Sequence, residues 1–423
     1  MADNKRILLC LAHMSGKEQE FIKEAFDTNW VVPLGPNVNG FEKDLEEFVN
    51  KCTDGNGPLE KKVVALSAGT AAVHLALIAC GVGPGDEVLV QSFTFCASSH
   101  PVTYLGATPV FVDSEPQTWN MDPQLLEEAI RDRIEKTGKK PKAIVPVALY
   151  GMPYKIDRIM EIADRYEIPV IEDAAEGFGS RYKGRVLGTF GRYGVLSFNG
   201  NKMITTSGGG ALICPDAEAR QQIMWYATQA RESYPYYQHE AIGYNYRMSN
   251  ICAGIGRGQM TVADEHIAHH RHVQALYREL LKDVPGIALH EAPSSDYDSN
   301  YWLCTATLDP DLKIRGQENA YRQVISGAVG GAAGVTHAVA SATTDCQPND
   351  NVEALRVALD AAGIESRPLW KPMHRQPVYR NSPAYTNGVS ESLFRVGIYL
   401  PAGPWVTDDH VRYIVDSIRA AII

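Results

Sequence analysis

A single lysine, Lys202, stands in the stretch SFNGNKMITTSGGG at residues 197–210, which is otherwise small, polar or apolar. The apolar runs on either side, VLSF and GGGALIC, predict buried strands. A lysine held at the end of a buried strand can form a Schiff base with an aldehyde and later act as a base. The alternative is an ordinary surface lysine in a hairpin, so the choice depends on which groups accompany it.

Two acids end another apolar strand, in the segment IPVIEDAAE at residues 168–176. Neighbouring residues of a strand point to opposite faces, so only one of Glu172 and Asp173 needs to face a site. Such a carboxylate can keep a heteroaromatic nitrogen protonated. The alternatives are a helix cap, an ion pair or a magnesium ligand, but no further acidic cluster with ligand spacing supports a metal, and we expect none.

Gly69 and Thr70 begin a helix-like segment, GTAAVHLAL. Free N–H groups at a helix N-terminus favour an anion, and a glycine lets the backbone approach it closely. Alone, the pattern fits a threonine cap equally well. An anion site, an acid and a lysine, in this order along one domain, together supply what pyridoxal phosphate needs: a phosphate cradle, a partner for the pyridine nitrogen and an imine lysine.

The segment from about 60 to 215 alternates between apolar strands and helices, which predicts an α/β domain with a mostly parallel sheet covered on both faces. Expected helices lie at 70–81, 97–106, 122–138 and 155–167, with Asp122 as an N-cap. Functional groups belong at the carboxyl ends of the strands of such a sheet. Residues 67–70, 173–176 and 197–202 all occupy such ends.

The pattern changes after residue 255, which predicts a large cofactor-binding domain at 1–255 and a smaller C-terminal domain at 256–423. A long amphipathic helix at 258–283 would join the two. A Gly/Ala-rich stretch at about 325–350 is expected to be an insertion or loop.

Bulk composition narrows the class of protein. The 423 residues hold 40 Lys and Arg against 50 Asp and Glu, a net charge of -10 that argues against bulk binding to nucleic acid or an anionic membrane. The eight cysteines form no C-x-x-C pair, and neither a signal peptide nor a spanning segment is evident. These features predict a soluble, cytoplasmic protein with free thiols.

Eight blocks of the chain resemble one known family over nearly its whole length. They are NWVVPLGPNVNGFEKDL, SAGTAAVHLAL, GDEVLVQSFTFCAS, PVFVDSEPQTWNMDP, VIEDAAEGFGSRYKG, LSFNGNKMITTSGGG, GYNYRMSNICAGIGRGQM and ESRPLWKPMHRQPVY. The chain resembles the DegT-like sugar nucleotide aminotransferases, which use pyridoxal 5'-phosphate. The resemblance implies the type I, aspartate aminotransferase-like fold, with a large domain and a smaller C-terminal α/β domain.

The resemblance assigns roles to individual positions of this chain. Lys202 matches the Schiff-base lysine and Asp173 the partner of the pyridine nitrogen. The other matched cofactor contacts are the phosphate contacts Gly69, Thr70 and Ser197, the ring-stacking Phe95, Glu176 beside the phenolic oxygen, and Asn245, which reaches the phosphate from the other subunit. The family therefore implies a homodimer with shared sites.

The segment PLWKPMH is similar to the substrate-facing segment of members that aminate C4 of a UDP-linked 4-keto-6-deoxy-N-acetylhexosamine. Trp370, Lys371 and His374 would then lie near the sugar or diphosphate, with L-glutamate as the amino donor. Glu176 also occurs in the branch that makes GDP-perosamine, so a GDP-linked substrate stays open. A sugar dehydratase is disfavoured because that branch replaces the lysine with histidine, and a non-catalytic regulator because Lys202, Asp173 and Thr70 are intact.

Other motifs have simpler interpretations. His266, His269 and His270 are spaced as metal ligands on a helix, but a solvated helix face explains them without a fourth ligand. The tyrosines of SYPYYQ, at residues 233–238, are expected to stack on a substrate or to cover the mouth of the site.

Overall fold

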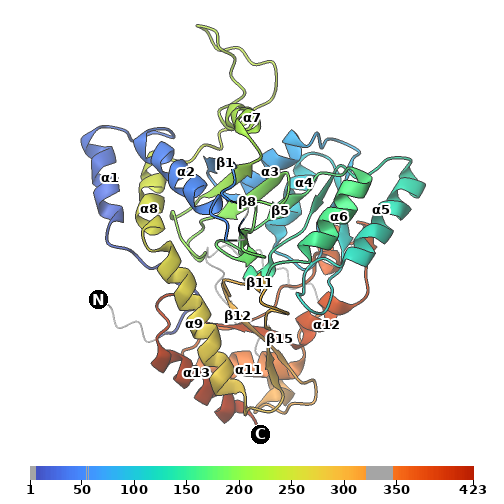
Figure 1. Ribbon diagram of the computed structural model, residues 1–423. Coiled ribbons are helices and arrows are strands. Elements are labelled where there is room, and N and C mark those ends of the chain that lie inside the picture. Colours follow the sequence, from blue (N-terminus) through green and yellow to red (C-terminus); the bar gives the residue numbers. More distant parts are fainter. Residues whose placement is uncertain (1–5, 54, 56, 321–345) are drawn as a thin grey trace.

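The computed structural model describes residues 6–53, 55, 57–320 and 346–423. A large α/β region leads through helix α9 (Ala263–Leu281) to a smaller one that holds the C-terminus (Figure 1). Most of the Gly/Ala-rich stretch predicted as an insertion, up to residue 345, lies outside the described residues.

The large region is built on eight strands. They are β1 (Lys62–Leu66), β2 (Glu87–Gln91), β3 (Thr108–Val112), β4 (Ala143–Val145), β5 (Ile171–Asp173), β8 (Tyr193–Ser197), β9 (Gly210–Cys214) and β14 (Ala384–Tyr385). Two four-stranded ladders, β14-β3-β2-β4 and β5-β8-β9-β1, are joined by parallel bridges from Ile144 to Val170 and from Val147 to Asp173. Only the pairings of β9, with β8 and β1, are antiparallel. The predicted α/β fold with a mostly parallel sheet is confirmed.

Both faces of this sheet are buried, as its nearly continuous apolar strands predict. In β1, Val63 and Ala65 join the core on one face, and Val64 and Leu66 the core on the other. The first face is covered by α2 (Pro36–Val49), α5 (Pro123–Thr137) and α6 (Ile156–Tyr166). The second is covered by α3 (Gly69–Ala79), α4 (His100–Tyr104) and α7 (Ala217–Ala227). As expected, Asp122 caps α5 by accepting from the Gln124 backbone N–H at 2.7 Å.

The helix predicted at 258–283 is interrupted, so that prediction is wrong at its start. Residues 258–260 end α8 (Asn250–Met260), which packs against α1 (Glu18–Asp27), and α9 begins only at Ala263. The Thr261 hydroxyl donates to the Gly258 carbonyl oxygen at 2.7 Å. Such a local bond competes with the helical ladder and favours a break between the two helices.

The smaller region has its own sheet and core. Its sheet has the order β10 (Ile287–Leu289), β12 (Cys304–Leu308), β15 (Gly397–Leu400) and β13 (Arg367–Pro368). Helices α9, α11 (Asp350–Ala361) and α13 (Asp408–Ala421) bury their apolar faces against it. Between β13 and β15 the chain returns to the large region, where β14 pairs with β3 before α12 (Val389–Val396) begins. A further three-stranded sheet comprises β6 (Arg181–Tyr182), β7 (Arg185–Val186) and β11 (Tyr297–Asp298).

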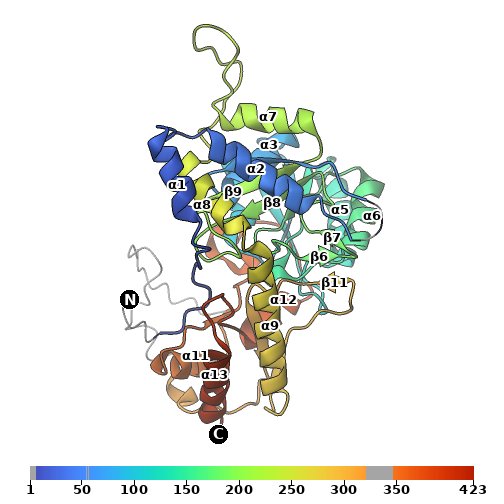
Figure 2. The same cartoon turned by 60° about the vertical axis from the view of Figure 1, so that its left-hand side comes forward.

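A hairpin-like segment projects from the body after α7 (Figures 1 and 2). Antiparallel bridges join Thr228 to Asn245 and Arg231 to His239 along it. Tyr234 and Tyr236 stack near its tip with ring centroids 5.4 Å apart, and both are exposed. The projection thus presents aromatic rings away from the chain's own core.

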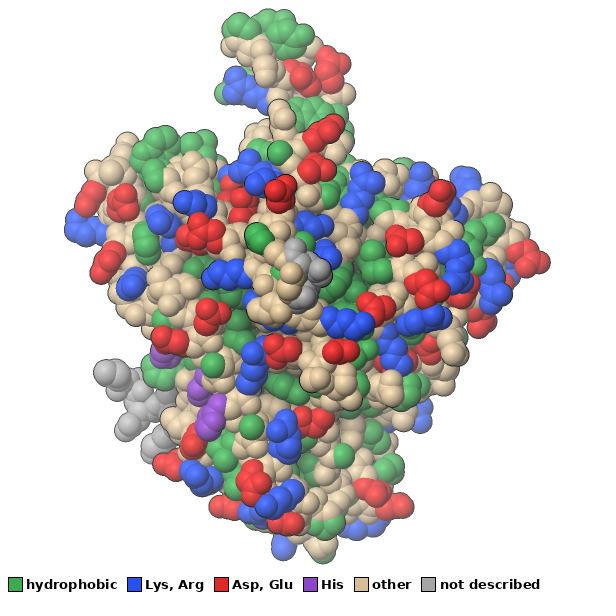
Figure 3. Space-filling model, viewed as in Figure 1, with side chains coloured by type: hydrophobic (Ala, Val, Ile, Leu, Met, Phe, Trp, Pro, Cys, Tyr) green, Lys and Arg blue, Asp and Glu red, His purple; other side chains and the backbone are tan. Residues whose placement is uncertain are grey.

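The surface carries both signs of charge. On the face shown in Figure 3, acidic and basic side chains are interspersed over the large and the smaller region. Within the described residues, no helix combines the length and the apolar character needed to cross a membrane.

Candidate active site

A cavity of about 290 Å³ opens at the carboxyl ends of β1, β5 and β8 and at the N-terminus of α3. It lies where a doubly wound sheet places its ligands. Eight residues predicted from the sequence line it: Gly69, Thr70, Phe95, Asp173, Glu176, Ser197, Lys202 and Trp370.

Lys202 sits in the turn that follows β8, where its backbone N–H donates to the Asn199 carbonyl oxygen at 2.9 Å. Its side chain is only 13% exposed, and its Nζ lies 3.5 Å from the Glu176 Oε1. The lysine is therefore held inside the cavity, and the alternative of an ordinary surface lysine is excluded.

Glu176 is fixed from the other side of the cavity. Its Oε2 accepts from the backbone N–H of Tyr150 at 2.6 Å, where Tyr150 adopts a φ of 53°. Burial raises the pKa of Glu176, while the charge of Lys202 and the Tyr150 hydrogen bond act in the opposite direction. The carboxyl group can therefore accept from the amine or hold a proton itself.

Asp173 ends β5 and points into the cavity. Its Oδ2 accepts from the Ser98 hydroxyl at 2.6 Å and its Oδ1 from the Ala175 backbone N–H at 3.1 Å, and the Thr94 and Ser98 hydroxyls lie 2.8 Å apart. Burial raises the pKa of Asp173, against these hydrogen bonds and the charge of Lys202. A cation beside this carboxylate offsets the cost of burying its charge, as a protonated pyridine nitrogen does.

The N-terminus of α3 is open to an anion. Its N-cap residue, Ala68, makes no side-chain hydrogen bond to the first turn, so a ligand can use those N–H groups. A Cβ on Gly210 would lie 2.4 Å from the Gly69 nitrogen, and one on Gly69 would lie 3.1 Å from the Ser197 Cβ. Glycine is thus required at position 210 for β9 and α3 to meet around this cradle, and a side chain at position 69 would press against Ser197 of β8.

A family model agrees with this geometry. The model of the DegT/DnrJ/EryC1/StrS aminotransferase family matches residues 13–323 and 317–419. The chain belongs to this family. The enzyme class predicted from the sequence, a pyridoxal-phosphate-dependent sugar aminotransferase, is confirmed at the level of the family.

Individual relatives cover almost the whole chain. It is 42% identical, over 98% of its length and 95% of the relative's, to EpsN of Bacillus subtilis, whose name places it among pyridoxal phosphate-dependent aminotransferases. It is 34% identical to the GDP-perosamine synthase of Escherichia coli O157:H7, over 96% of each chain. A DegT DnrJ EryC1 StrS aminotransferase structure from Brucella abortus superposes with a TM-score of 0.79 at 28% identity, covering 96% of this chain and 95% of that one. The predicted type I fold is confirmed.

The donor set fits the family's cofactor, pyridoxal phosphate. Lys202 would bind its aldehyde carbon, Asp173 would face its ring nitrogen, and the first turn of α3 would hold its phosphate. Phe95, which is 50% exposed, lies beside the cavity with its ring centroid 5.5 Å from that of Trp370. Trp370 is held in place because its backbone N–H donates to the Tyr150 hydroxyl at 2.9 Å.

Three predicted site residues do not line the cavity of their own chain. Asn245 is exposed at the base of the projecting hairpin. Lys371 is half-buried beside Trp370. His374 lies between two other groups: its Nδ1 is 2.6 Å from the Ser92 hydroxyl and its Nε2 is 3.1 Å from the Glu391 Oε1.

Sequence reasoning missed Ser98, Tyr150 and Trp302, which support or line the site. Ser98 lies within one of the matched blocks, so its proximity to Phe95 could have drawn attention to it. Neither Tyr150 nor Trp302 belongs to a motif. The solvated helix face expected for the three histidines is wrong for two of them, because His266 is 4% exposed, His270 is fully buried, and the His266 Nδ1 lies 3.2 Å from the Met203 carbonyl oxygen. Among the described residues, no group of His, Cys, Asp or Glu side chains is arranged to hold a metal.

Proposed function

We propose that this enzyme transfers the amino group of L-glutamate to C4 of a nucleotide-linked 4-keto-6-deoxy sugar, UDP-2-acetamido-2,6-dideoxy-4-hexulose. The observation that carries the proposal is one cavity that holds the Lys202 amine, the buried Asp173 carboxylate and the uncapped N-terminus of α3. Substrate would enter past Trp370, whose buried indole N–H has no hydrogen-bond partner among the residues that the structure describes.

Each residue has a role in this reaction. When bound, pyridoxal phosphate supplies an electron sink for the carbon that loses its proton. Lys202 would take the proton from Cα of glutamate and deliver it, and the same amine would move a proton in the opposite direction when the keto sugar binds. Asp173 would keep the pyridine nitrogen protonated, while the α3 N-terminus, Thr70 and Ser197 would hold the phosphate.

The nucleotide of the sugar substrate has two candidates. The segments SFNGNK and PLWKPMH resemble the UDP-linked N-acetylhexosamine branch. The 34% identity to a GDP-perosamine synthase supports an alternative, GDP-4-keto-6-deoxymannose, and Glu176 agrees with either. Both alternatives keep amination at C4 and differ in the nucleotide and in the substituent at C2 of the sugar.

We further propose that two copies of the chain share their sites, in a homodimer located in the cytoplasm. Asn245 is exposed at the base of the projecting hairpin and lines no part of its own cavity. This placement suits a residue that serves the phosphate of a second copy. The stacked pair Tyr234 and Tyr236, exposed on the same hairpin, would then cover the mouth of the partner's cavity.

The deciding experiment is an absorption spectrum of the purified protein with its cofactor. The visible band should disappear with L-glutamate and return with the UDP-linked keto sugar, and a Lys202→Ala variant should show neither change. If the band returned only with GDP-4-keto-6-deoxymannose, the GDP-linked sugar would be the substrate. If it returned with neither sugar, both substrates would be rejected. If L-glutamate did not remove the band, glutamate would be rejected as the amino donor.

A further inference from the structure

The side chain of Trp302 forms part of the cavity wall beside the reactive lysine. The Lys202 Nζ lies over the face of its ring, 4.1 Å from the ring centroid. The indole Nε1 donates to the backbone carbonyl oxygen of Asn201 at 2.8 Å. Trp302 therefore contacts the lysine loop twice, once at the amine and once at the main chain.

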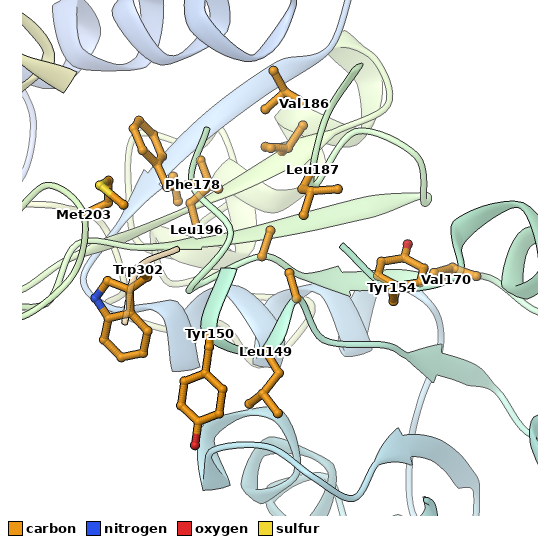
Figure 4. Close-up of a cluster of buried hydrophobic side chains, with 14 of the residues drawn as sticks. Leu149, Tyr150, Tyr154, Val170, Phe178, Val186, Leu187, Leu196, Met203 and Trp302 are labelled. Atoms are coloured by element: carbon orange, nitrogen blue, oxygen red, sulfur yellow. The ribbon is translucent and has the colours of Figure 1, made fainter. Parts of the chain in front are cut away.

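Trp302 is itself rigidly placed. Only 2% of it is exposed, and it belongs to the buried cluster that includes Leu196, Phe178 and Met203 (Figure 4). Its backbone N–H donates to the Asn300 Oδ1 at 2.8 Å. A residue fixed by packing, by a backbone hydrogen bond and by a side-chain hydrogen bond can define a position for the group that it contacts.

Asn300, two residues before Trp302, binds the loop that carries Glu176. Its Nδ2 donates to the carbonyl oxygens of Glu176 and Phe178, each at 2.9 Å. A Cβ on Gly151 would clash with the Asn300 side chain, so Gly151 allows this close approach. The segment Asn300–Trp302 thus links the loop of Lys202 to the loop of Glu176.

The Lys202 amine contacts two groups that attract a cation. One is the face of the Trp302 ring, whose quadrupole is negative. The other is the Glu176 Oε1, 3.5 Å away, on a side chain that is 4% exposed. Because both groups are nearly buried, water screens these attractions little.

We propose that Trp302 is a positioning residue for the proton transfers of Lys202. The inference rests on the proposed function, in which the Cα–H bond of the amino donor breaks and an N–H bond forms on Nζ. The bound cofactor would supply the sink for the electron pair of the broken bond, and the proton would stay on Nζ until the lysine delivers it. During that interval the Trp302 ring face and the Glu176 carboxylate would hold the ammonium in place.

The test compares three variants of the full-length enzyme. Trp302→Leu removes both the ring face and the indole N–H, whereas Trp302→Phe keeps a smaller aromatic face and removes the N–H. Trp119→Leu is the matched control, because Trp119 is also a buried tryptophan of the same core, stacked on His290 at 3.7 Å, and does not line the cavity. Circular dichroism and thermal melting show whether each variant is folded.

The first readout is the single-turnover reaction with L-glutamate alone, which does not depend on the identity of the sugar. Trp302→Leu should slow this step about tenfold, without changing the glutamate concentration for half-maximal rate. The primary isotope effect with glutamate deuterated at Cα should increase, because proton transfer then limits the rate. Trp302→Phe should stay within about threefold of the wild type, and Trp119→Leu should match it.

The second readout needs neither cofactor nor activity. The cofactor-free proteins are treated with formaldehyde and cyanoborohydride, and methylation of Lys202 is followed by mass spectrometry. Loss of the ring face should release the amine and speed its labelling severalfold in Trp302→Leu only. This labelling tests the contact between Trp302 and Lys202 even if the enzyme does not react with glutamate and the proposed function is wrong.

Three results would overturn the inference. In the first, Trp302→Leu keeps the wild-type rate and labelling. In the second, Trp119→Leu is impaired equally, which would indicate a general loss of packing. In the third, Trp302→Phe is as slow as Trp302→Leu, which would assign the effect to the hydrogen bond with Asn201 and not to the ring face.

Discussion

Glu172 and Asp173 are adjacent at the end of β5, yet their carboxylates serve opposite faces of the sheet. Asp173 points into the cavity, where it accepts from the Ser98 hydroxyl at 2.6 Å. Glu172 points away and binds the loop before β8, accepting from the backbone N–H groups of Phe190 at 2.5 Å and Gly191 at 2.6 Å. One acid therefore has a chemical role and its neighbour a structural one.

This division predicts opposite phenotypes for two isosteric substitutions. Glu172→Gln should lower the free energy of unfolding by about 1–3 kcal/mol, because one amide oxygen cannot replace two carboxylate oxygens that accept three backbone N–H groups. Asp173→Asn should fold normally but react with glutamate at least about tenfold more slowly, since it loses the charge that pairs with the pyridine nitrogen. Urea unfolding and single-turnover rates separate the two effects.

Each variant is the control for the other. If Asp173→Asn were as unstable as Glu172→Gln and kept its rate, the assignment of the two acids would have to be reversed.

The parts of the site that the sequence predicted are those encoded by short segments. The buried strand before Asp173, the glycine at the start of α3 and the isolated lysine after β8 are local patterns, and the sheet brings strand ends together by construction. This is why the predicted residues at the strand ends line one cavity, whereas Phe95 and Trp370, which also line it, are assigned from the family resemblance.

The parts of the site that the sequence did not predict depend on contacts between distant segments of the chain. Trp302 reaches Lys202 only because the chain returns from the smaller region through Asn300, and nothing in the local sequence around Trp302 indicates this. The break between α8 and α9 has a different cause: apolar periodicity continues across Thr261 and Val262, although the backbone leaves the helical conformation at Val262, where φ is -123°.

Replacing Glu176 with glutamine should stabilise the cofactor-free protein at neutral pH. Burial raises the pKa of Glu176 above its unfolded value, so the native state binds this proton more tightly than the unfolded state does. Stability is therefore lost as pH rises from the unfolded pKa of about 4.5 through the raised native value. Glutamine removes that loss and can still accept from the Tyr150 N–H.

Melting curves at pH 5 and pH 7.5 test the direction of this pH dependence of stability. The advantage of Glu176→Gln over the wild type should be larger at pH 7.5. An advantage that grew on acidification would show that the attraction to Lys202 outweighs the cost of burying the charge.

His374 should act by fixing the chain segment that follows Trp370. Its imidazole connects Ser92, which follows β2, to Glu391 on α12, and it does not line the cavity. His374→Ala should therefore lower the free energy of unfolding by about 1–3 kcal/mol and raise KM for the keto sugar about three- to tenfold, with little effect on the glutamate step.

Glu391→Gln distinguishes this role from direct substrate contact. This substitution changes the partner of the His374 Nε2, which lies 3.1 Å from the Glu391 Oε1. If His374 only fixes the segment after Trp370, Glu391→Gln should weaken that role, and KM for the sugar should rise as it does in His374→Ala. If His374→Ala impaired the sugar step strongly while Glu391→Gln changed nothing, the contact with substrate implied by the family resemblance would be the better account.

A buried histidine should make the protein sensitive to mild acid. Burial, with the nearby His269 and His266, lowers the pKa of His270 to about 3, whereas the unfolded value is about 6.5. Below pH 6.5 the unfolded chain therefore binds a proton at this histidine that the native protein does not bind, and stability falls as pH decreases toward 3. Between pH 7.5 and 5.5 the titration of this single group should lower the free energy of unfolding by about 1 kcal/mol.

Because other buried histidines titrate as well, the test is the difference between the wild type and His270→Leu in urea unfolding at the two pH values. The variant is expected to be the less stable protein at pH 7.5 if packing suffers, yet it should lose less stability on acidification, and parallel losses in the two proteins would contradict the prediction.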